Sequence, residues 1–179
     1  MTRVKLISRR LIYAGRVIRL YREVLEVAGK RLVRETAQHP GAVVIAPVLD
    51  DGRLVCVRQY RRAVDRTLLE LPAGTLEPGE AREACARREL EEETGWRAGR
   101  LRRLTQFYAA PGVISEQLTV FLAQGLVRAA ARPDADELVE PVILPMRIAL
   151  AHIRSRAICD AKTIIGIWMA AAALRRRQA

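Results

Sequence analysis

Hydrophobic and polar residues follow a strand-like pattern through the first third of the chain. The stretch from about 7 to 38 predicts strands, with Ala28-Gly29-Lys30 as the turn between two of them. Two runs rich in β-branched residues follow, at 42–49 and 54–60. The Asp51-Gly52 pair between them is typical of a tight turn. The pattern therefore predicts that these two runs form a β-hairpin.

The pattern changes after Pro78-Gly79. Residues 80–94 contain no glycine or proline and are rich in alanine, arginine, glutamate and leucine, which predicts a helix that ends at Gly95. Asp160 is suited to cap the start of a last helix. The other expected elements are strands at 67–71, 101–109, 117–123 and 138–144, and helices near 146–154 and 161–175. This order predicts an α+β fold, in which a mixed central sheet lies between helices as an α/β/α sandwich.

Composition narrows the class of protein. The 179 residues suffice for one domain with a proper core, and half of them are hydrophobic, which argues against disorder. No apolar run is long enough to cross a bilayer, and the first residues do not resemble a signal peptide. The three cysteines are scattered and odd in number, which fits reduced thiols. We therefore expect a cytoplasmic protein without a membrane partner.

The net charge of +11 has two interpretations. A basic surface for nucleic acid is one of them. However, lysine occurs only at Lys5, Lys30 and Lys162, and arginines spread along the whole chain supply the rest. A general compositional bias explains this spread better than a binding patch does, so nucleic acid is not the expected partner. A positive field would also steer small anionic substrates to the protein.

Three glutamates mark the predicted helix as the centre of chemistry. Glu89, Glu92 and Glu93 are spaced so that a helix places them on one face. Such crowding of like charge weakens a helix unless a cation relieves it. With only two histidines and no paired cysteines, carboxylates would hold any metal, which indicates magnesium or manganese. A solvated acidic helix face with incidental spacing is the alternative.

A longer pattern decides between these two interpretations. From Gly74 to Trp96 the chain has Gly, five residues, Glu, seven residues, and then Arg-Glu-Leu-x-Glu-Glu-x-Gly-Trp. This segment matches every fixed position of the Nudix box, so the chain resembles the Nudix hydrolase family. Further segments resemble its ADP-ribose pyrophosphatase branch: Arg58–Arg61, the His39 turn, Tyr108–Glu116 and Asp160–Thr163.

The resemblance implies an enzyme that cleaves ADP-ribose, or a related nucleoside diphosphate derivative, with two or three Mg²⁺ or Mn²⁺ ions. It implies that the ions are held by the carbonyl of Ala73 and by Glu89, Glu93 and Glu137. The implied catalytic residues are Glu92, Glu93 and Glu137, and the implied substrate-binding residues are Arg34, Arg61 and Glu116. The chain departs from the branch at Ala135, where relatives are acidic. The general base therefore stays open between Glu137, Asp136 and a box glutamate.

The resemblance also implies an assembly. Residues 1–40 would form a strand arm for dimerisation, and 41–179 the Nudix domain. In relatives the arm exchanges between two subunits, so a homodimer is expected; an arm folded on its own subunit is the alternative. Two other functions stay open. One is hydrolysis of nucleotide sugars, dinucleotides or RNA 5′ ends, and the other is a catalytically silent domain that senses a ligand.

Overall fold

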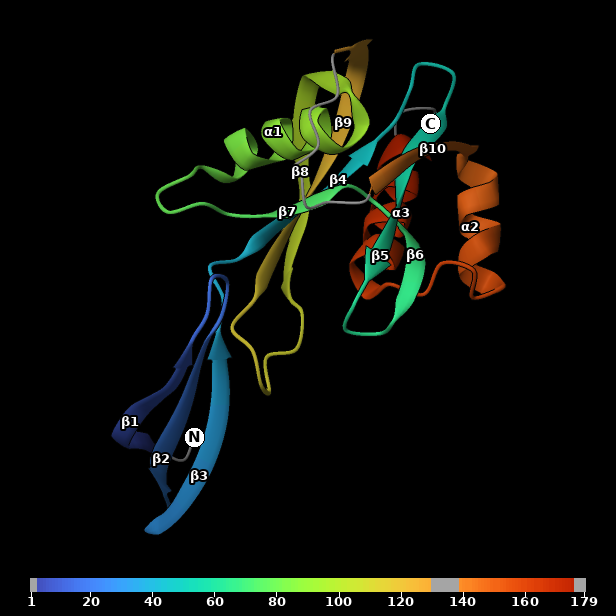
Figure 1. Ribbon diagram of the computed structural model, residues 1–179. Helices are drawn as coiled ribbons and strands as arrows, with labels where there is room; N and C mark the ends of the chain where they lie inside the picture. Colours follow the sequence, from blue (N-terminus) through green and yellow to red (C-terminus); the bar gives the residue numbers. More distant parts are fainter. Residues whose placement is uncertain (1–2, 130–138, 176–179) are drawn as a thin grey trace. The chain divides into compact units, whose positions relative to one another are not determined.

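The computed structural model describes residues 3–129 and 139–175, and the chain divides into two compact units (Figure 1). The first unit comprises Met1–Gly41 and Tyr108–Gln117, and the second comprises Ala42–Phe107 and Leu118–Ala179. Each unit is described in turn.

The first unit is built on an antiparallel sheet of three strands. These are β1 (Val4–Ala14), β2 (Arg19–Val27) and β3 (Lys30–Gln38), in the order β1-β2-β3. The predicted turn is confirmed: Val27 pairs with Lys30, and Ala28 and Gly29 have positive φ angles of 50° and 76°. Positive φ at both central residues is the geometry whose twist matches paired strands.

The second unit has two sheets. One has the order β7-β4-β9-β8, with β4 antiparallel to β7 and parallel to β9, so the sheet is mixed. The other has the order β10-β5-β6 and is antiparallel. The strands are β4 (Ala42–Pro47), β5 (Arg53–Arg61), β6 (Arg66–Glu70), β7 (Ala73–Thr75), β8 (Trp96–Tyr108), β9 (Gln117–Arg128) and β10 (Val139–Pro145).

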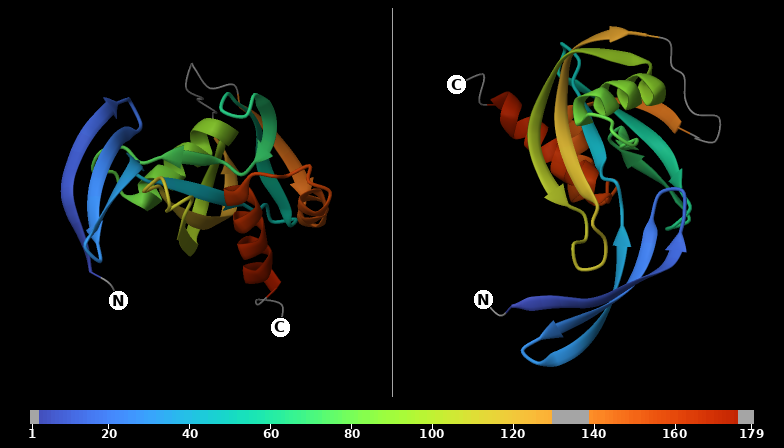
Figure 2. Two further views of the ribbon diagram at one scale, coloured as in Figure 1. Left: turned by 90° about the horizontal axis from the view of Figure 1, so that it is seen from below. Right: turned by 90° about the vertical axis from the view of Figure 1, so that its left-hand side faces the viewer.

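Helices cover both faces of β4, which is buried along its whole length. The helices are α1 (Arg82–Thr94), α2 (Met146–Arg154) and α3 (Ala161–Arg175). Side chains alternate across a strand, so Val43 and Ile45 pack with Leu90 of α1, while Val44 and Ala46 pack with Ile167 of α3. Figure 2 shows α1 and α3 on opposite sides of this strand. The predicted α+β class and the sandwich are therefore confirmed.

The predicted hairpin between 42–49 and 54–60 is wrong. The Asp51-Gly52 turn exists, since Leu49 N–H donates to the Arg53 carbonyl at 2.9 Å and Gly52 has φ 79°. Beyond a single bridge from Val48 to Leu54, however, the strands β4 and β5 enter different sheets. The continuous apolar run of β4 is typical of a strand buried on both faces, which takes partners from distant parts of the chain.

None of the helices in the described parts of the chain is long and apolar enough to cross a membrane.

Candidate active site

Helix α1 presents the three glutamates that the sequence singles out. It ends where predicted, because Gly95 takes a left-handed conformation with φ 68° and its N–H donates to the Glu91 carbonyl. Glu89 and Glu93 are only 8% and 3% exposed, and Glu92 is half-buried. Leu90 on the apolar side is fully buried, which fixes the rotation of the helix against the sheet. The burial of two carboxylates one turn apart is costly and needs nearby donors or cations.

Strand β7 supplies such contacts from its backbone. The N–H of Ala73 donates to Oε2 of Glu93 at 3.2 Å. A Cβ added to Gly74 would lie 1.8 Å from Cδ of Glu89, so only glycine leaves room for that carboxylate. The main chain at 73–74 is therefore packed directly against both buried glutamates.

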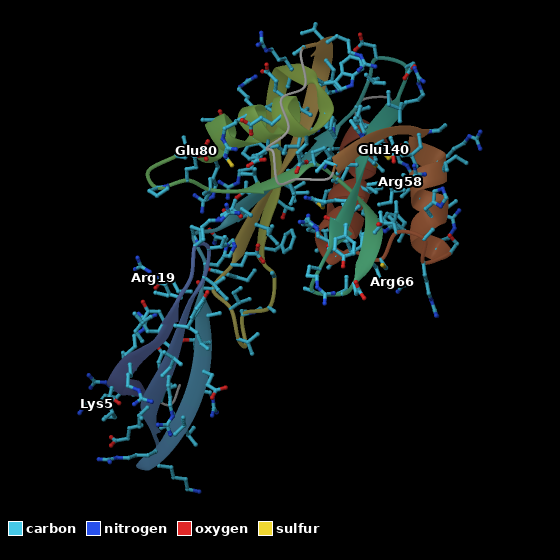
Figure 3. All side chains as sticks on the ribbon, viewed as in Figure 1. Lys5, Arg19, Arg58, Arg66, Glu80 and Glu140 are labelled. Atoms are coloured by element: carbon cyan, nitrogen blue, oxygen red, sulfur yellow. The ribbon has the colours of Figure 1, made fainter. Side chains whose placement is uncertain are left out.

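Arg88 joins three carboxylates. Its Nη1 donates to Glu89 at 2.8 Å and to Glu92 at 3.0 Å, while Nε and Nη2 hold Glu80 at 3.0 and 3.1 Å. Figure 3 labels Glu80, just before α1. These hydrogen bonds, led by the one with Glu80, raise the pKa of Arg88, and the Arg88 hydrogen bond lowers the pKa of Glu80. Arg88 therefore orients the carboxylates of Glu80, Glu89 and Glu92.

The donor set fits a hard divalent cation. Carboxylate and carbonyl oxygens are the ligands that magnesium and manganese prefer, and two buried negative charges favour a cation beside them. Among the residues that the structure describes, no three His, Cys, Asp or Glu side chains form a ready-made cage for an ion. The glutamates and the carbonyl of Ala73 would thus have to share an ion with water or substrate, as Mg²⁺ commonly requires. Glu137 and Asp136 lie outside the described residues.

Arg61 lies at the end of β5 in a second ionic cluster. Its Nε and Nη2 hold Glu70 at 3.0 and 2.7 Å, and the Lys162 ammonium binds the same carboxylate. Burial alone would lower the pKa of Arg61, but its hydrogen bond to Glu70 and the nearby charge of Glu93 raise it. The structure thus brings Arg61 into the electrostatic field of Glu93.

Glu70 and Lys162 are residues that sequence reasoning missed. The segment Asp160–Thr163 stands out by resemblance, but nothing in the sequence assigns it a partner. Glu70 and Lys162 lie 92 positions apart, so only the fold brings them together. The one local signal is a glutamate at the end of an apolar strand, where a buried carboxylate requires a cation.

Glu116 and Arg34 belong to the first unit. Gly41 N–H donates to Nδ1 of His39 at 3.0 Å, so a neutral His39 carries its proton on Nε2, which lies 3.8 Å from Oε1 of Glu116. Arg34 is exposed on β3, and its Nη1 donates to the Val33 carbonyl.

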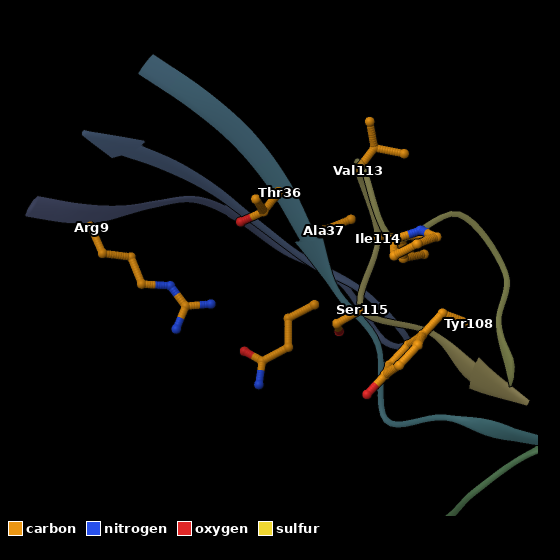
Figure 4. Close-up of a pocket in the computed structure, with 9 residues that line it drawn as sticks. Arg9, Thr36, Ala37, Tyr108, Val113, Ile114 and Ser115 are labelled. Atoms are coloured by element: carbon orange, nitrogen blue, oxygen red, sulfur yellow. The ribbon is translucent and has the colours of Figure 1, made fainter. Parts of the chain in front are cut away.

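The loop that precedes Glu116 is tied to β3. Ala37 N–H donates to the Val113 carbonyl at 2.8 Å, and Ser115 N–H donates to the Ala37 carbonyl at 2.9 Å. A pocket of about 320 Å³ lies between this loop and the sheet (Figure 4). Its polar lining includes Arg9, Gln38, Tyr108 and Ser115. Backbone hydrogen bonds at Ala37 therefore attach the loop to the sheet of the first unit.

Residues 38–159 match the family described as the NUDIX domain. The chain belongs to the NUDIX family. It is 43% identical over 166 residues to a protein named ADP-ribose pyrophosphatase from Bacillus subtilis (strain 168), with 91% of this chain and 90% of the relative covered. It is 37% identical, with the same coverage, to a methanol dehydrogenase activator from Bacillus methanolicus.

A solved structure titled "Crystal structure of ADP compounds hydrolase" is similar in fold. Its TM-score is 0.86 at 23% identity, and the match covers 97% of this chain and 95% of that one. The family prediction is therefore confirmed. The roles of individual residues stay predictions.

Proposed function

We propose that this NUDIX protein is a pyrophosphohydrolase that cleaves ADP-ribose to AMP and ribose 5-phosphate. The observation that carries the proposal is the pair of buried carboxylates, Glu89 and Glu93, packed on one face of α1 against the backbone at Ala73 and Gly74. The relatives named ADP-ribose pyrophosphatase, from Bacillus subtilis and, at 40% identity over 131 residues, from Mycobacterium tuberculosis, support this choice of substrate.

The proposed cofactor is Mg²⁺ or Mn²⁺, two to three ions per site, held by Glu89, Glu93, Glu137 and the carbonyl of Ala73. Such ions, when bound, neutralise the diphosphate and lower the pKa of a bound water. Arg88 keeps Glu89 and Glu92 oriented, since it donates to both.

The remaining residues act on the water and on the substrate. We assign proton transfer from the attacking water to Glu92, Glu93 or Glu137. We assign the diphosphate to Arg61, whose pairing with Glu70 uses two of its five N–H donors and leaves both N–H groups of Nη1 outside that pair. Glu116 would accept a hydrogen bond from the terminal ribose, and Arg34 would contact the ligand.

A substrate panel assayed with Mg²⁺ and with Mn²⁺ tests the proposal. We expect ADP-ribose to be cleaved far better than dinucleoside polyphosphates or capped RNA, since Glu116 against a ribose hydroxyl is worth roughly 1–3 kcal/mol. GDP-mannose belongs in the panel because a relative named GDP-mannose pyrophosphatase, from Citrobacter koseri, is 34% identical to the chain over 134 residues. Preference for GDP-mannose or for RNA ends would overturn the assignment of substrate. If no substrate is cleaved with either ion, the remaining alternative is a domain that only senses a ligand.

We further propose that the protein is a homodimer formed through its residues 1–40, with the Nudix domain at 41–179. All of β1 is exposed, including the apolar Val4, Leu6 and Leu11. An exposed apolar strand is a typical interaction surface. The cysteines are free, with Cys159 exposed, which supports a reducing compartment such as the cytoplasm.

A further inference from the structure

The first turn of α3 contacts the strand segment that leads into the candidate active site. Glu70 ends β6 with only 1% of its surface exposed. Arg61 holds it in a two-point hydrogen-bonded pair, and Lys162 of α3 donates to Oε2 of the same carboxylate. Because a carboxylate this deeply buried is stable only with cations in place, its position fixes both partners.

The residues after Glu70 are held one after another by different elements. Leu71 N–H donates to Oγ1 of Thr163 in α3 at 2.9 Å, and the Pro72 carbonyl accepts from Ile45 N–H of β4 at 2.8 Å. Ala73 N–H then donates to Glu93 of α1. This path runs without a break from α3 to the buried glutamates.

Lys162 is itself fixed within its helix. Its ammonium lies 3.0 Å from Asp160, and Asp160 caps the helix by accepting from Thr163 N–H at 2.9 Å. The packing is close here as well, because a Cβ on Gly166 would lie 2.5 Å from Cδ1 of Leu71. The four charges of Arg61, Glu70, Lys162 and Asp160 sum to zero.

We propose that Glu70, clamped by Lys162, is a positioning residue that holds the Arg61 guanidinium ready for the substrate's diphosphate. The inference rests on the proposed function, since Arg61 acts on a diphosphate only if the protein cleaves one. A purely structural ion cluster would stabilise the fold without setting substrate affinity, and this difference can be measured.

The test compares Glu70→Gln, which removes the charge and keeps the shape, with Glu140→Gln as a matched control. Glu140 pairs with Arg58 at 3.6 Å between neighbouring strands, but both side chains are more than half exposed (Figure 3). In Glu70→Gln we expect KM for ADP-ribose to rise about tenfold while kcat changes by less than about threefold, because an interaction of charged groups is weakened. Glu140→Gln should match the wild type.

Variants of Lys162 provide a second test in case Glu70→Gln does not fold. Lys162→Met should raise KM in the same direction, and Lys162→Arg, which keeps the charge, should stay within about twofold of the wild type. An unchanged KM in Glu70→Gln and Lys162→Met, with only a lower thermal midpoint, would overturn the proposal.

A second readout separates this inference from the proposed function. The Nε–H signal of Arg61 in ¹⁵N NMR, assigned by its loss in Arg61→Lys, should be protected from exchange because Nε donates to Glu70. Glutamine keeps one acceptor oxygen, so the variant for this readout is Glu70→Ala, which removes both acceptor oxygens and should remove most of that protection. If the wild-type protein cleaves no ADP-ribose, the proposed function fails while this signal still tests the positioning. A signal that stays protected in Glu70→Ala would refute the positioning itself.

Discussion

At the scale of single residues, the site concentrates negative charge where water is scarce. Glu89 and Glu93 keep little contact with solvent, and Arg88 donates a hydrogen bond to Glu89. Burial of like charges is unfavourable unless a binding partner uses them. The same crowding of charge that weakens the helix by itself would therefore strengthen the binding of a cation, if one binds there as proposed.

Replacement of Glu93 by glutamine tests this view. Glu93→Gln keeps the size and the hydrogen bond from Ala73 N–H but removes a charge, so turnover should fall by at least about a hundredfold, as expected when charge stabilisation is lost. Glu91→Gln is the matched control, because Glu91 lies on the same helix and pairs with Arg97 instead. The turnover of both variants is measured by steady-state kinetics at equal concentrations of folded protein. Near-normal turnover in Glu93→Gln would remove Glu93 from the site.

Gly74→Ala tests the close packing of the β7 backbone against Glu89. The added methyl group would overlap the Glu89 carboxylate, so Glu89 must move away from the backbone. We expect Mn²⁺ affinity, measured by calorimetry, and turnover to fall by at least about tenfold, since small displacements at a reacting centre are costly. Wild-type Mn²⁺ affinity in a folded Gly74→Ala protein would contradict the packing described.

Part of this site can be predicted from the sequence. The rest cannot, because it depends on contacts between residues that lie far apart along the chain. Glu89, Glu92 and Glu93 share a helix, so their spacing alone places them on one face. The contact of Arg88 with Glu80 depends on the loop before the helix. The contact of Lys162 with Glu70 depends on how α3 packs, which no local pattern encodes.

At the scale of elements, the helix boundaries were predictable because they depend on local chemistry. Gly95 ends α1 and Asp160 caps α3, as expected from their residue types. The partners of the strands were not predictable in this way, because β4 pairs with β9, more than seventy positions away, rather than with its neighbour β5. Alternation describes a strand but does not choose its partner.

The cap of α3 predicts a pH dependence of stability. Burial would raise the pKa of Asp160, but Lys162 and the hydrogen bonds from Thr163 outweigh it and lower the pKa below the ordinary 3.8. A depressed pKa contributes stability that is present above pH 3.8 and is lost as the pH falls through the folded-state value. Asp160→Asn keeps a capping side chain without the titration, so it should cost about 1–2 kcal/mol at pH 7.

Urea unfolding at pH 7, 4 and 3 measures the effect. The difference in unfolding free energy between the wild type and Asp160→Asn should shrink as the pH falls below 4. A difference that stays constant over this range would show that the Asp160 charge does not stabilise the fold.

At the scale of the whole molecule, the exposed strand β1 of the first unit favours a dimer. Every residue of β1 is exposed, and large apolar side chains such as Ile12 and Tyr13 are among them. The strand is paired with β2, but its side chains stay exposed on both faces, so they favour a partner surface. A two-fold dimer would bury the same patch on both chains.

A mixing experiment tests whether such a dimer shares its sites. We propose that Arg34 acts on the site of the neighbouring subunit, and so we expect Arg34→Ala and Glu93→Gln each to be nearly inactive alone. In a mixed dimer of the two, shared sites require that one site carries both defects and the other carries neither. The mixed dimer can be isolated after co-expression with two affinity tags. It should have about half of the wild-type activity per dimer, because one of its two sites is intact.

The composition of the mixed dimer must be established by native mass spectrometry before its activity is interpreted. Chains that act on their own sites would give two sites with one defect each, and hence no recovery. Mixed dimers without recovery would therefore rule out Arg34 acting across the interface. A monomer at assay concentration would rule out the exchanged arm itself, because an arm that exposes all of β1 would then be stable without a partner.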